Sequence, residues 1–303
     1  MKIAVTGASG LIGSTLVPEL RADGHEVIRL VRRTPRTADE HRWDPQHRRI
    51  DPALLRDVDA VVNLAGTPIR PRPFTEAYRR DLLASRVDST TTIAEALATA
   101  AAEDPSRRRV LLSASAVGYY GDTGDRVVEE DAPPGDDFLA RVCVQWEAAT
   151  APAAEAGVRV VTLRTGLVIG RGAMLVRILG TVFRLGLGGR VGSGRQYWPW
   201  VSLDDEVGAI RFLLTAGEVS GPVNLTGPDP VRNDEFVREL GRAVHRPTVL
   251  PVPGFAIRSA LGEFGRSNVL AGQRAVPARL LAAGYPFRHR DLPSALREAL
   301  DRG

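Results

Sequence analysis

The sequence predicts an α/β fold, in which a doubly wound parallel sheet is followed by a smaller C-terminal lobe. Three observations lead to this prediction. Short apolar runs alternate with helical patterns six times over residues 1–170, a glycine-rich turn follows the first run, and the alternation stops beyond residue 170. We therefore expect a sheet domain over residues 1–170 and a substrate lobe over residues 171–303, with elements around residues 200–226 returning to the sheet.

The first apolar run, Ile3–Val5, is typical of a strand buried on both faces, and a helical pattern starts shortly after it. Gly7 permits a tight turn, Gly10 lets the backbone approach a pyrophosphate, and Gly13 lets the helix pack against the strand. Since N–H groups at a helix start attract anions, this position favours a Rossmann-type nucleotide site over an ordinary strand–helix turn. The predicted cofactor-binding residues of this segment are Gly7, Ser9, Gly10, Leu11, Ile12 and Gly13.

The composition narrows the classes of partner. Of the 303 residues, 44% are hydrophobic and 25% are charged, as in ordinary globular proteins. No apolar run approaches the ~20 residues that span a bilayer, and no cleavable signal precedes the first strand, so we expect no membrane contact. The 40 basic residues are interleaved with 36 acidic ones, which argues against nucleic acid as a partner.

The numbers and spacing of cysteine and histidine residues argue against a disulfide bond and a metal site. Cys143 is the only cysteine, so an intramolecular disulfide cannot form, and a cytoplasmic location is expected. The five histidines show no metal-ligand spacing, and we therefore expect no metal.

Arginines follow the second predicted strand, Glu26–Val31. An NAD-selective site would place an acidic residue near this point to bind the 2′-hydroxyl of the ribose. Arg32 instead suits a 2′-phosphate by its charge and its planar fork, and it predicts NADP(H) as the cofactor. A solvated loop is the alternative, because Arg33 and Arg36 make the whole region basic. A later buried strand ends at three small or apolar residues that we expect to line the cofactor: Leu64, Ala65 and Gly66.

Segments along essentially the whole chain follow the pattern of one known superfamily. They are Thr6–Gly13, Asn63–Gly66, Ser85–Arg86, Ser113–Gly121, Phe138–Glu147, Leu163–Gly170, Trp198–Asp205, Gly221–Thr226, His245–Pro247, Gly272–Gln273, Pro277 and Gly284–Phe287. Together they resemble the extended, epimerase/dehydratase-like branch of the short-chain dehydrogenase/reductase superfamily. The Phe-Leu-Ala…Cys…Trp-Glu run is a specific marker of its "epimerase family protein" subgroup. The resemblance implies that NADP(H) is contacted by Arg32, Leu64, Ala65, Asp81 and Arg86.

The chain departs from the wider superfamily at one pair of residues. Most members use a Tyr-x-x-x-Lys pair, in which the lysine lowers the pKa of the tyrosine so that it can exchange a proton with the substrate. Aligned through Glu147, Leu139 stands at the tyrosine position and Cys143 at the lysine position. Lys2, in the first predicted strand, is the only lysine and cannot substitute for it. The usual mechanism is therefore not available to this chain.

Two functions stay open. The first is an NADP(H)-dependent oxidoreductase or epimerase-like enzyme acting on a small carbonyl or sugar-type substrate, with Ser115 and Tyr119 as its catalytic residues. Ser115 would hydrogen-bond the substrate carbonyl, and Tyr119 or Tyr120 would donate a proton. The second is a non-catalytic NADP(H)-binding sensor or interaction protein, in which the same hydroxyls only satisfy a turn. Neither the identity of the small-molecule substrate nor the oligomeric state follows from the sequence.

The C-terminal lobe is expected to form the wall of the substrate site, from about Gly170 to Trp200 and again from Pro228 onward. The reason is that the strand–helix alternation stops there, and function often resides in such added segments. The aromatic run Tyr197–Trp200 fits either stacking on a ligand ring or packing in the core.

Overall fold

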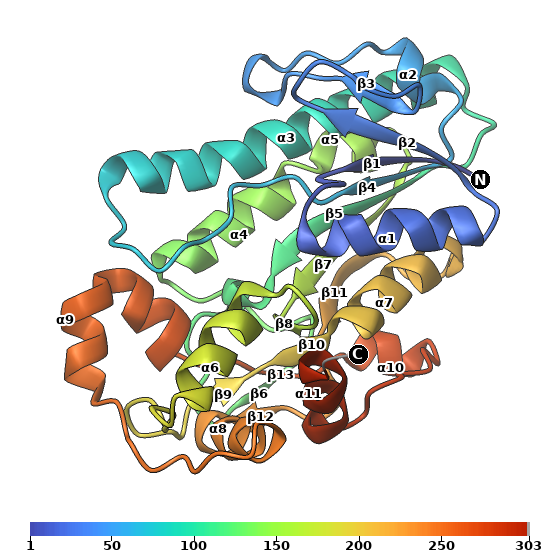
Figure 1. Ribbon diagram of the computed structural model, residues 1–303. Helices are drawn as coiled ribbons and strands as arrows, with labels where there is room; N and C mark the ends of the chain where they lie inside the picture. Colours follow the sequence, from blue (N-terminus) through green and yellow to red (C-terminus); the bar gives the residue numbers. More distant parts are fainter. Residues whose placement is uncertain (302–303) are drawn as a thin grey trace.

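The computed structural model describes residues 1–301, and a seven-stranded parallel sheet forms its centre (Figure 1). The strands are β1 (Lys2–Thr6), β2 (Glu26–Val31), β3 (Glu40–Arg42), β4 (Ala60–Asn63), β5 (Val110–Ala116), β7 (Arg159–Thr165) and β11 (Gly221–Leu225). Their order is β11-β7-β5-β4-β1-β2-β3, so the winding direction reverses between β1 and β4. Ligands of doubly wound sheets bind in the crevice at such a reversal, beyond the carboxyl ends of the strands. The predicted fold class is confirmed.

Helices cover both faces of the sheet because its strands are apolar on both sides. In β1, Ile3 and Val5 pack toward α1 (Leu11–Ala22) and α7 (Leu203–Thr215). Ala4, between them, packs on the opposite face with α3 (Glu76–Glu103) and α5 (Ala151–Glu155). This face also carries α2 (Ala53–Arg56), while α4 (Phe138–Ala148) packs along α3.

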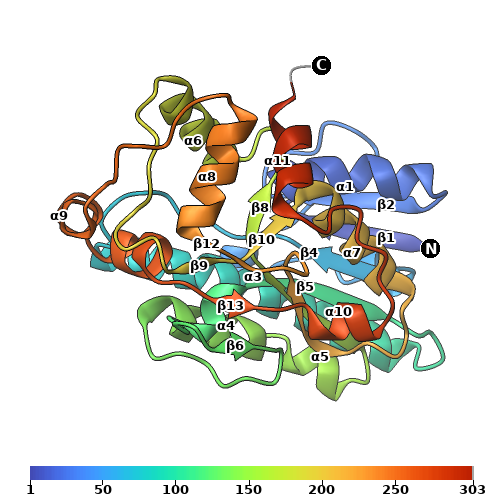
Figure 2. The same cartoon turned by 90° about the horizontal axis from the view of Figure 1, so that it is seen from below.

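The C-terminal part has an apolar core of its own, built around Trp198, Trp200 and Phe236. It lies against the carboxyl edge of the sheet (Figure 2). The division at residue 170 stays a prediction, and α7 and β11 belong to the sheet layer. The remaining elements are β6 (Val127–Val128), β8 (Leu167–Ile169), α6 (Met174–Arg184), β9 (Tyr197–Trp198), β10 (Trp200–Ser202), β12 (Val231–Arg232), α8 (Asn233–Ala243), α9 (Gly254–Phe264), β13 (Arg274–Ala275), α10 (Ala278–Ala282) and α11 (Leu292–Leu300). A π-helical turn over Gly265–Leu270 follows α9, and short 3₁₀ turns span Pro45–His47 and Val117–Tyr120.

Two segments differ from the periodicity of the sequence. The polar stretch 34–52 contains the edge strand β3, whose charged residues Glu-His-Arg give no strand pattern. The helical stretch 138–156 divides into α4 and α5, because Pro152 lacks the N–H that would continue the first helix. Within residues 1–301, no helix combines the length and apolar character needed to cross a bilayer.

Candidate functional site

The glycine turn after β1 is set by backbone contacts. Gly7 has φ +63°, and a Cβ atom there would lie 2.6 Å from the carbonyl oxygen of Leu64. A Cβ atom on Gly13 would lie 2.4 Å from the carbonyl oxygen of Gly7. At Gly10, by contrast, the nearest atom to a Cβ would be 3.2 Å away, and this exposed residue begins α1 without a side-chain cap. Gly7 and Gly13 are thus required by the fold, and Gly10 is less crowded, with the carbonyl oxygen of Gly7 as the one close neighbour of a Cβ atom.

A single hydroxyl group holds the loop after β4 against this turn. Thr6 Oγ1 donates to Asn63 Oδ1 at 2.7 Å and accepts from the backbone N–H groups of Leu64 at 3.0 Å and Ala65 at 3.1 Å. All three hydrogen-bonding positions of the hydroxyl group are occupied. The end of β1 and the loop after β4 therefore form one rigid edge at the reversal of the sheet.

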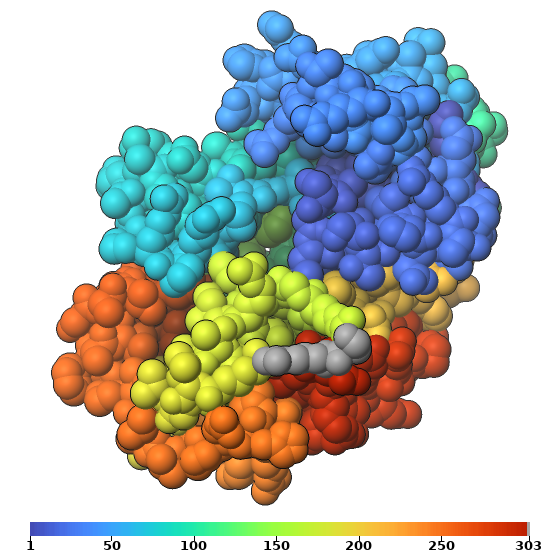
Figure 3. All heavy atoms as spheres, viewed as in Figure 1, coloured from blue at the N-terminus to red at the C-terminus, as the bar shows by residue number. Residues whose placement is uncertain are grey.

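A cavity of about 710 Å³ opens at this edge, and we call it the large cavity. In Figure 3 the surface is hollowed between the dark blue N-terminal elements and the cyan α3. Of the predicted cofactor residues, Leu11, Ile12, Gly13 and Arg86 do not line it. Those that do line it are Gly7, Ser9, Gly10, Arg32, Leu64, Ala65, Gly66 and Asp81.

Two adjacent arginines at the end of β2 have different surroundings. Arg33 donates to both oxygens of Glu40, at 2.6 and 2.7 Å, and these bonds lower the pKa of Glu40 to about 2. Arg32 is exposed at the large cavity, and within residues 1–301 its guanidinium has neither a carboxylate nor a hydrogen-bond partner. The charge of Arg33 is thus neutralised by Glu40, whereas the charge of Arg32 is available to bind an anion.

A second cavity of about 180 Å³, here called the small pocket, lies between α4, the ends of β5 and β7, and the C-terminal lobe. Leu139 and Cys143, at the expected positions of the tyrosine and the lysine, are both buried in its wall. Burial raises the pKa of the Cys143 thiol to about 12, so this group is neutral at physiological pH. The small pocket thus holds neither the acid nor the cation of the usual pair at these positions.

The hydroxyl group of Ser115 is directed into a buried ion pair. It donates to Glu147 Oε1 at 2.6 Å, and Glu147 accepts two bonds of 2.8 Å from Arg164. The half-buried ring of Tyr119 lies under the same guanidinium, with its centroid 3.5 Å from Arg164 Cζ. Tyr120 is fully buried and donates to Asn224 at 2.7 Å. Neither Ser115 nor the two tyrosines line the small pocket, and the catalytic roles of Ser115 and Tyr119 stay a prediction.

Residues 3–226 match the NAD dependent epimerase/dehydratase family. The chain belongs to this family. A further match, over residues 252–299, is to a domain of unknown function, DUF1731.

Relatives of similar length carry the name "epimerase family protein". One from Mycobacterium bovis, Mb2239, is 48% identical over 300 residues, which cover 99% of this chain and 98% of that protein. The human protein SDR39U1 is 35% identical over 301 residues, with 98% and 99% covered. A crystal structure of human SDR39U1 with NADPH superposes with a TM-score of 0.86 at 32% identity, covering 99% of both chains. The family and these neighbours support an NAD(P)-binding, epimerase-like function, without specifying the substrate or the catalytic residues.

Arg86, which the resemblance assigns to the cofactor, lines the small pocket and not the large cavity. The side chain is 7% exposed and lines the small pocket, its guanidinium 4.9 Å from the centroid of the Trp146 ring. Its Nη1 atom donates to the carbonyl oxygen of Leu82 at 3.0 Å. No carboxylate of residues 1–301 lies within ion-pair distance of this group. A buried cation therefore stands in the pocket wall without a counter-charge.

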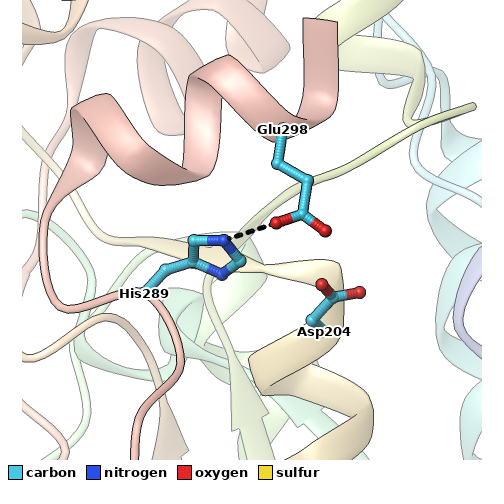
Figure 4. Close-up of side chains that lie close together, drawn as sticks. All are labelled: Asp204, His289 and Glu298. Carbon is cyan, nitrogen blue, oxygen red and sulfur yellow. Dashed lines mark hydrogen bonds and ion pairs between the residues drawn. The ribbon is translucent and has the colours of Figure 1, made fainter. Parts of the chain in front are cut away.

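A cluster of ionisable groups at the start of α7 was also missed, because its members are far apart in sequence. Ligand atoms of Asp204, His289 and Glu298 lie within 4.8 Å of one another (Figure 4). His289 Nε2 is 2.9 Å from Glu298, and its Nδ1 is 3.0 Å from Ser202 Oγ. Arg288 approaches both carboxylates, each at 3.0 Å. With these partners the cluster ties α11 to α7, and the expectation of no metal stays a prediction.

Proposed function

We propose that the chain is an NADP(H)-dependent oxidoreductase or epimerase-like enzyme that acts on a small carbonyl or sugar-type substrate. The observation that carries the choice of cofactor is the unpaired Arg32 at the large cavity, beside the fully paired Arg33. A free guanidinium at the end of the second strand suits a 2′-phosphate, and an acid that would bind a ribose hydroxyl is absent at that position. The complex of human SDR39U1 with NADPH agrees with this proposal.

The remaining cofactor residues take roles that follow from their positions. The exposed backbone of Gly10 and the uncapped N–H groups of Leu11 and Ile12 would hold the pyrophosphate, as at other helix starts. Ala65 and Gly66 would lie along the cofactor chain, because Thr6 fixes their backbone at the cavity edge. NADPH, when bound, supplies a hydride. Asp81, exposed on α3, faces the same cavity and completes the predicted set.

Titration of NADPH and NADH against the parent protein and Arg32→Ala tests the cofactor choice. A charge-assisted contact contributes about 1.5–3 kcal/mol, so the parent should prefer NADPH by roughly ten- to a hundredfold. Arg32→Ala should remove this preference by weakening NADPH alone. Arg36→Ala is the matched control, since Arg36 is exposed nearby but does not line the large cavity. Equal affinities for the two cofactors in the parent would refute the proposal.

A non-catalytic NADP(H)-binding protein is the second candidate, favoured by the hydrogen bond from Ser115 to Glu147. A hydroxyl group that donates to a carboxylate cannot donate to a substrate carbonyl unless that bond breaks first. If Ser115 and Tyr119 do act in catalysis, Ser115→Ala and Tyr119→Phe should each slow NADPH oxidation by about 10²–10⁴-fold with a carbonyl substrate. No NADPH oxidation by the parent with any carbonyl compound would favour the sensor or interaction protein.

We further propose that the protein acts on a small molecule, has no nucleic-acid partner and is located in the cytoplasm. The name of an Arabidopsis thaliana relative, 37% identical over 311 residues, assigns that protein to the chloroplast. Localisation of a tagged full-length chain tests this part of the proposal directly.

A further inference from the structure

We propose that the outer side of the C-terminal lobe, around α6, is a docking surface for a membrane that contains anionic lipids. Two segments form this surface, residues 174–190 and residues 245–258, and we call it the lobe surface. Neither segment lines the large cavity or the small pocket. The inference therefore goes beyond the proposed function and does not depend on the cofactor.

Helix α6 is apolar on two opposite sides. Its inner side packs against α8 and α11, and the residues buried there are Val176, Gly180 and Phe183. Met174, Ile178 and Leu185 are 46–68% exposed on the other side, and at helical spacing they lie within about 40° of one another around the axis. A helix that is already packed does not need this second apolar stripe for its own fold, and exposed stripes of this kind mark contact surfaces.

The chain that follows α8 extends the apolar stripe. Residues 188–192 and 250–252 run alongside each other through backbone hydrogen bonds, two of which join Val252 to Arg190 and Gly192 at 2.9 Å. Figures 1 and 2 both show α6 beside α8 and α9. Four more apolar side chains in these segments are 47–70% exposed: Leu187, Val249, Leu250 and Phe255. The two segments thus present one apolar surface to the solvent.

The charges on the lobe surface have one sign. Residues 171–202 and 240–262 contain no aspartate or glutamate. Arg177, Arg184, Arg246 and Arg258 are exposed, and within residues 1–301 no carboxylate lies at ion-pair distance from them. On α6, Arg177 and Arg184 stand beside the apolar stripe, about 60° and 80° from Met174 around the axis. The lobe surface therefore combines apolar side chains with unpaired cations.

A membrane with anionic lipids satisfies both features. Acyl chains accept the apolar side chains, while the arginine stems let the guanidinium groups reach the lipid phosphates. A guanidinium binds a phosphate group through two parallel hydrogen bonds. A second copy of the chain fits less well, because a symmetric contact would bring like-charged arginines together.

Surface binding agrees with the proposed location, since the cytoplasmic leaflet of cell membranes carries anionic lipids. The expectation of no membrane contact rests on the lack of a spanning segment in the sequence. A protein that binds at the surface needs only an exposed apolar face and cations.

Co-sedimentation of the full chain with sucrose-loaded vesicles tests this inference. Vesicles of phosphatidylcholine alone are compared with an equimolar mixture of phosphatidylcholine and phosphatidylglycerol. The parent should bind the mixed vesicles at least tenfold more tightly, and added salt should weaken this binding. Leu185→Ser and Phe255→Ser should each weaken it about tenfold, and Arg184→Gln about fivefold.

Two exposed residues outside the lobe surface provide matched controls. Leu281→Ser removes an apolar side chain that is 43% exposed on α10, and Arg108→Gln removes an exposed arginine before β5. Both should bind the mixed vesicles like the parent. Because every substituted residue is exposed, all variants should unfold near the parent temperature and bind NADPH with the parent's affinity.

Four results would overturn the inference: no binding of the parent to the mixed vesicles, equal binding to the two compositions, parental binding by both Leu185→Ser and Phe255→Ser, or the same loss in Leu281→Ser. Light scattering without vesicles tests the other occupant. A parent dimer that Leu185→Ser converts to a monomer would assign the lobe surface to a second copy of the chain instead. Glycerol 3-phosphate, at the phosphate concentration of the vesicles, should not displace the protein, and displacement would indicate a site for a free phosphate compound.

Discussion

The large cavity and the small pocket are built in different ways. The large cavity is bounded by backbone: Gly7 and Gly13 have no room for a Cβ atom, and Thr6 fixes the neighbouring loop through two N–H groups. The small pocket is bounded by side chains from α3, α4, the strand ends and the C-terminal lobe. The buried pair of Glu147 and Arg164 directly adjoins, along the chain, two of its lining residues, Trp146 and Thr165. A backbone site tolerates changes to most of its side chains, whereas a side-chain site depends on each buried partner.

The largest effect should come from the ion pair near the small pocket. Glu147→Leu leaves the guanidinium of Arg164, whose side chain is 4% exposed, without its carboxylate. The free energy of unfolding in urea should fall by about 3–5 kcal/mol. Ser115→Ala removes one donor to the same carboxylate and should cost about 1 kcal/mol. Equal losses in the two variants would mean that the ion pair is not the element that supports this region.

The next effect depends on pH and concerns Glu206, which accepts from Thr165 of the small pocket at 2.8 Å. Burial raises the pKa of Glu206 to about 8, and its Oε2 has no partner among residues 1–301. Between pH 5 and pH 8 the native state then binds more protons than the unfolded state, so stability falls as pH rises. The loss attributable to Glu206 is about 3 kcal/mol over this window.

Denaturation of the parent and Glu206→Gln at several pH values isolates this contribution. The variant should be close to the parent near pH 5 and should become relatively more stable as the pH rises toward 8. A difference between the two that does not change with pH would contradict a raised pKa at Glu206.

The smallest effects are expected for two glycine variants of the large cavity, and they separate a loss of stability from a loss of NADPH binding. Gly13→Ala places a Cβ atom 2.4 Å from the carbonyl oxygen of Gly7 and should lower the free energy of unfolding by about 1–3 kcal/mol. Gly10→Ala has 3.2 Å at its closest contact and should lose less than about 1 kcal/mol. The same Gly10 variant should bind NADPH more weakly, since its methyl group enters the space proposed for the pyrophosphate. Stability is measured by denaturation and affinity by titration. A larger loss of stability in Gly10→Ala than in Gly13→Ala would contradict the assignment of Gly13 to the fold.

The sequence predicts the large cavity better than the small pocket for a physical reason. The glycine spacing is a local motif, because Gly10 and Gly13 both approach the carbonyl oxygen of Gly7, a few positions away, although the approach of Gly7 to Leu64 joins distant segments. Arg32 could likewise be found from the end of one strand. The partner of Ser115 lies 32 residues away, and Asn268 reaches the small pocket from the opposite end of the chain. The missing counter-charge of Arg86 is a property of the packed structure and leaves no pattern in the sequence.

The wall of the small pocket also carries the only thiol of the chain. Cys143 is 4% exposed, and no second cysteine competes with it for a reagent. A thiol probe can therefore react at one place only, and only while the wall around that place is open. The rate of modification then measures how often the pocket opens in the native protein, without any engineered label. A ligand that closes the pocket would slow this reaction. The rate of Cys143 modification would therefore report how much of the protein has ligand bound in the small pocket.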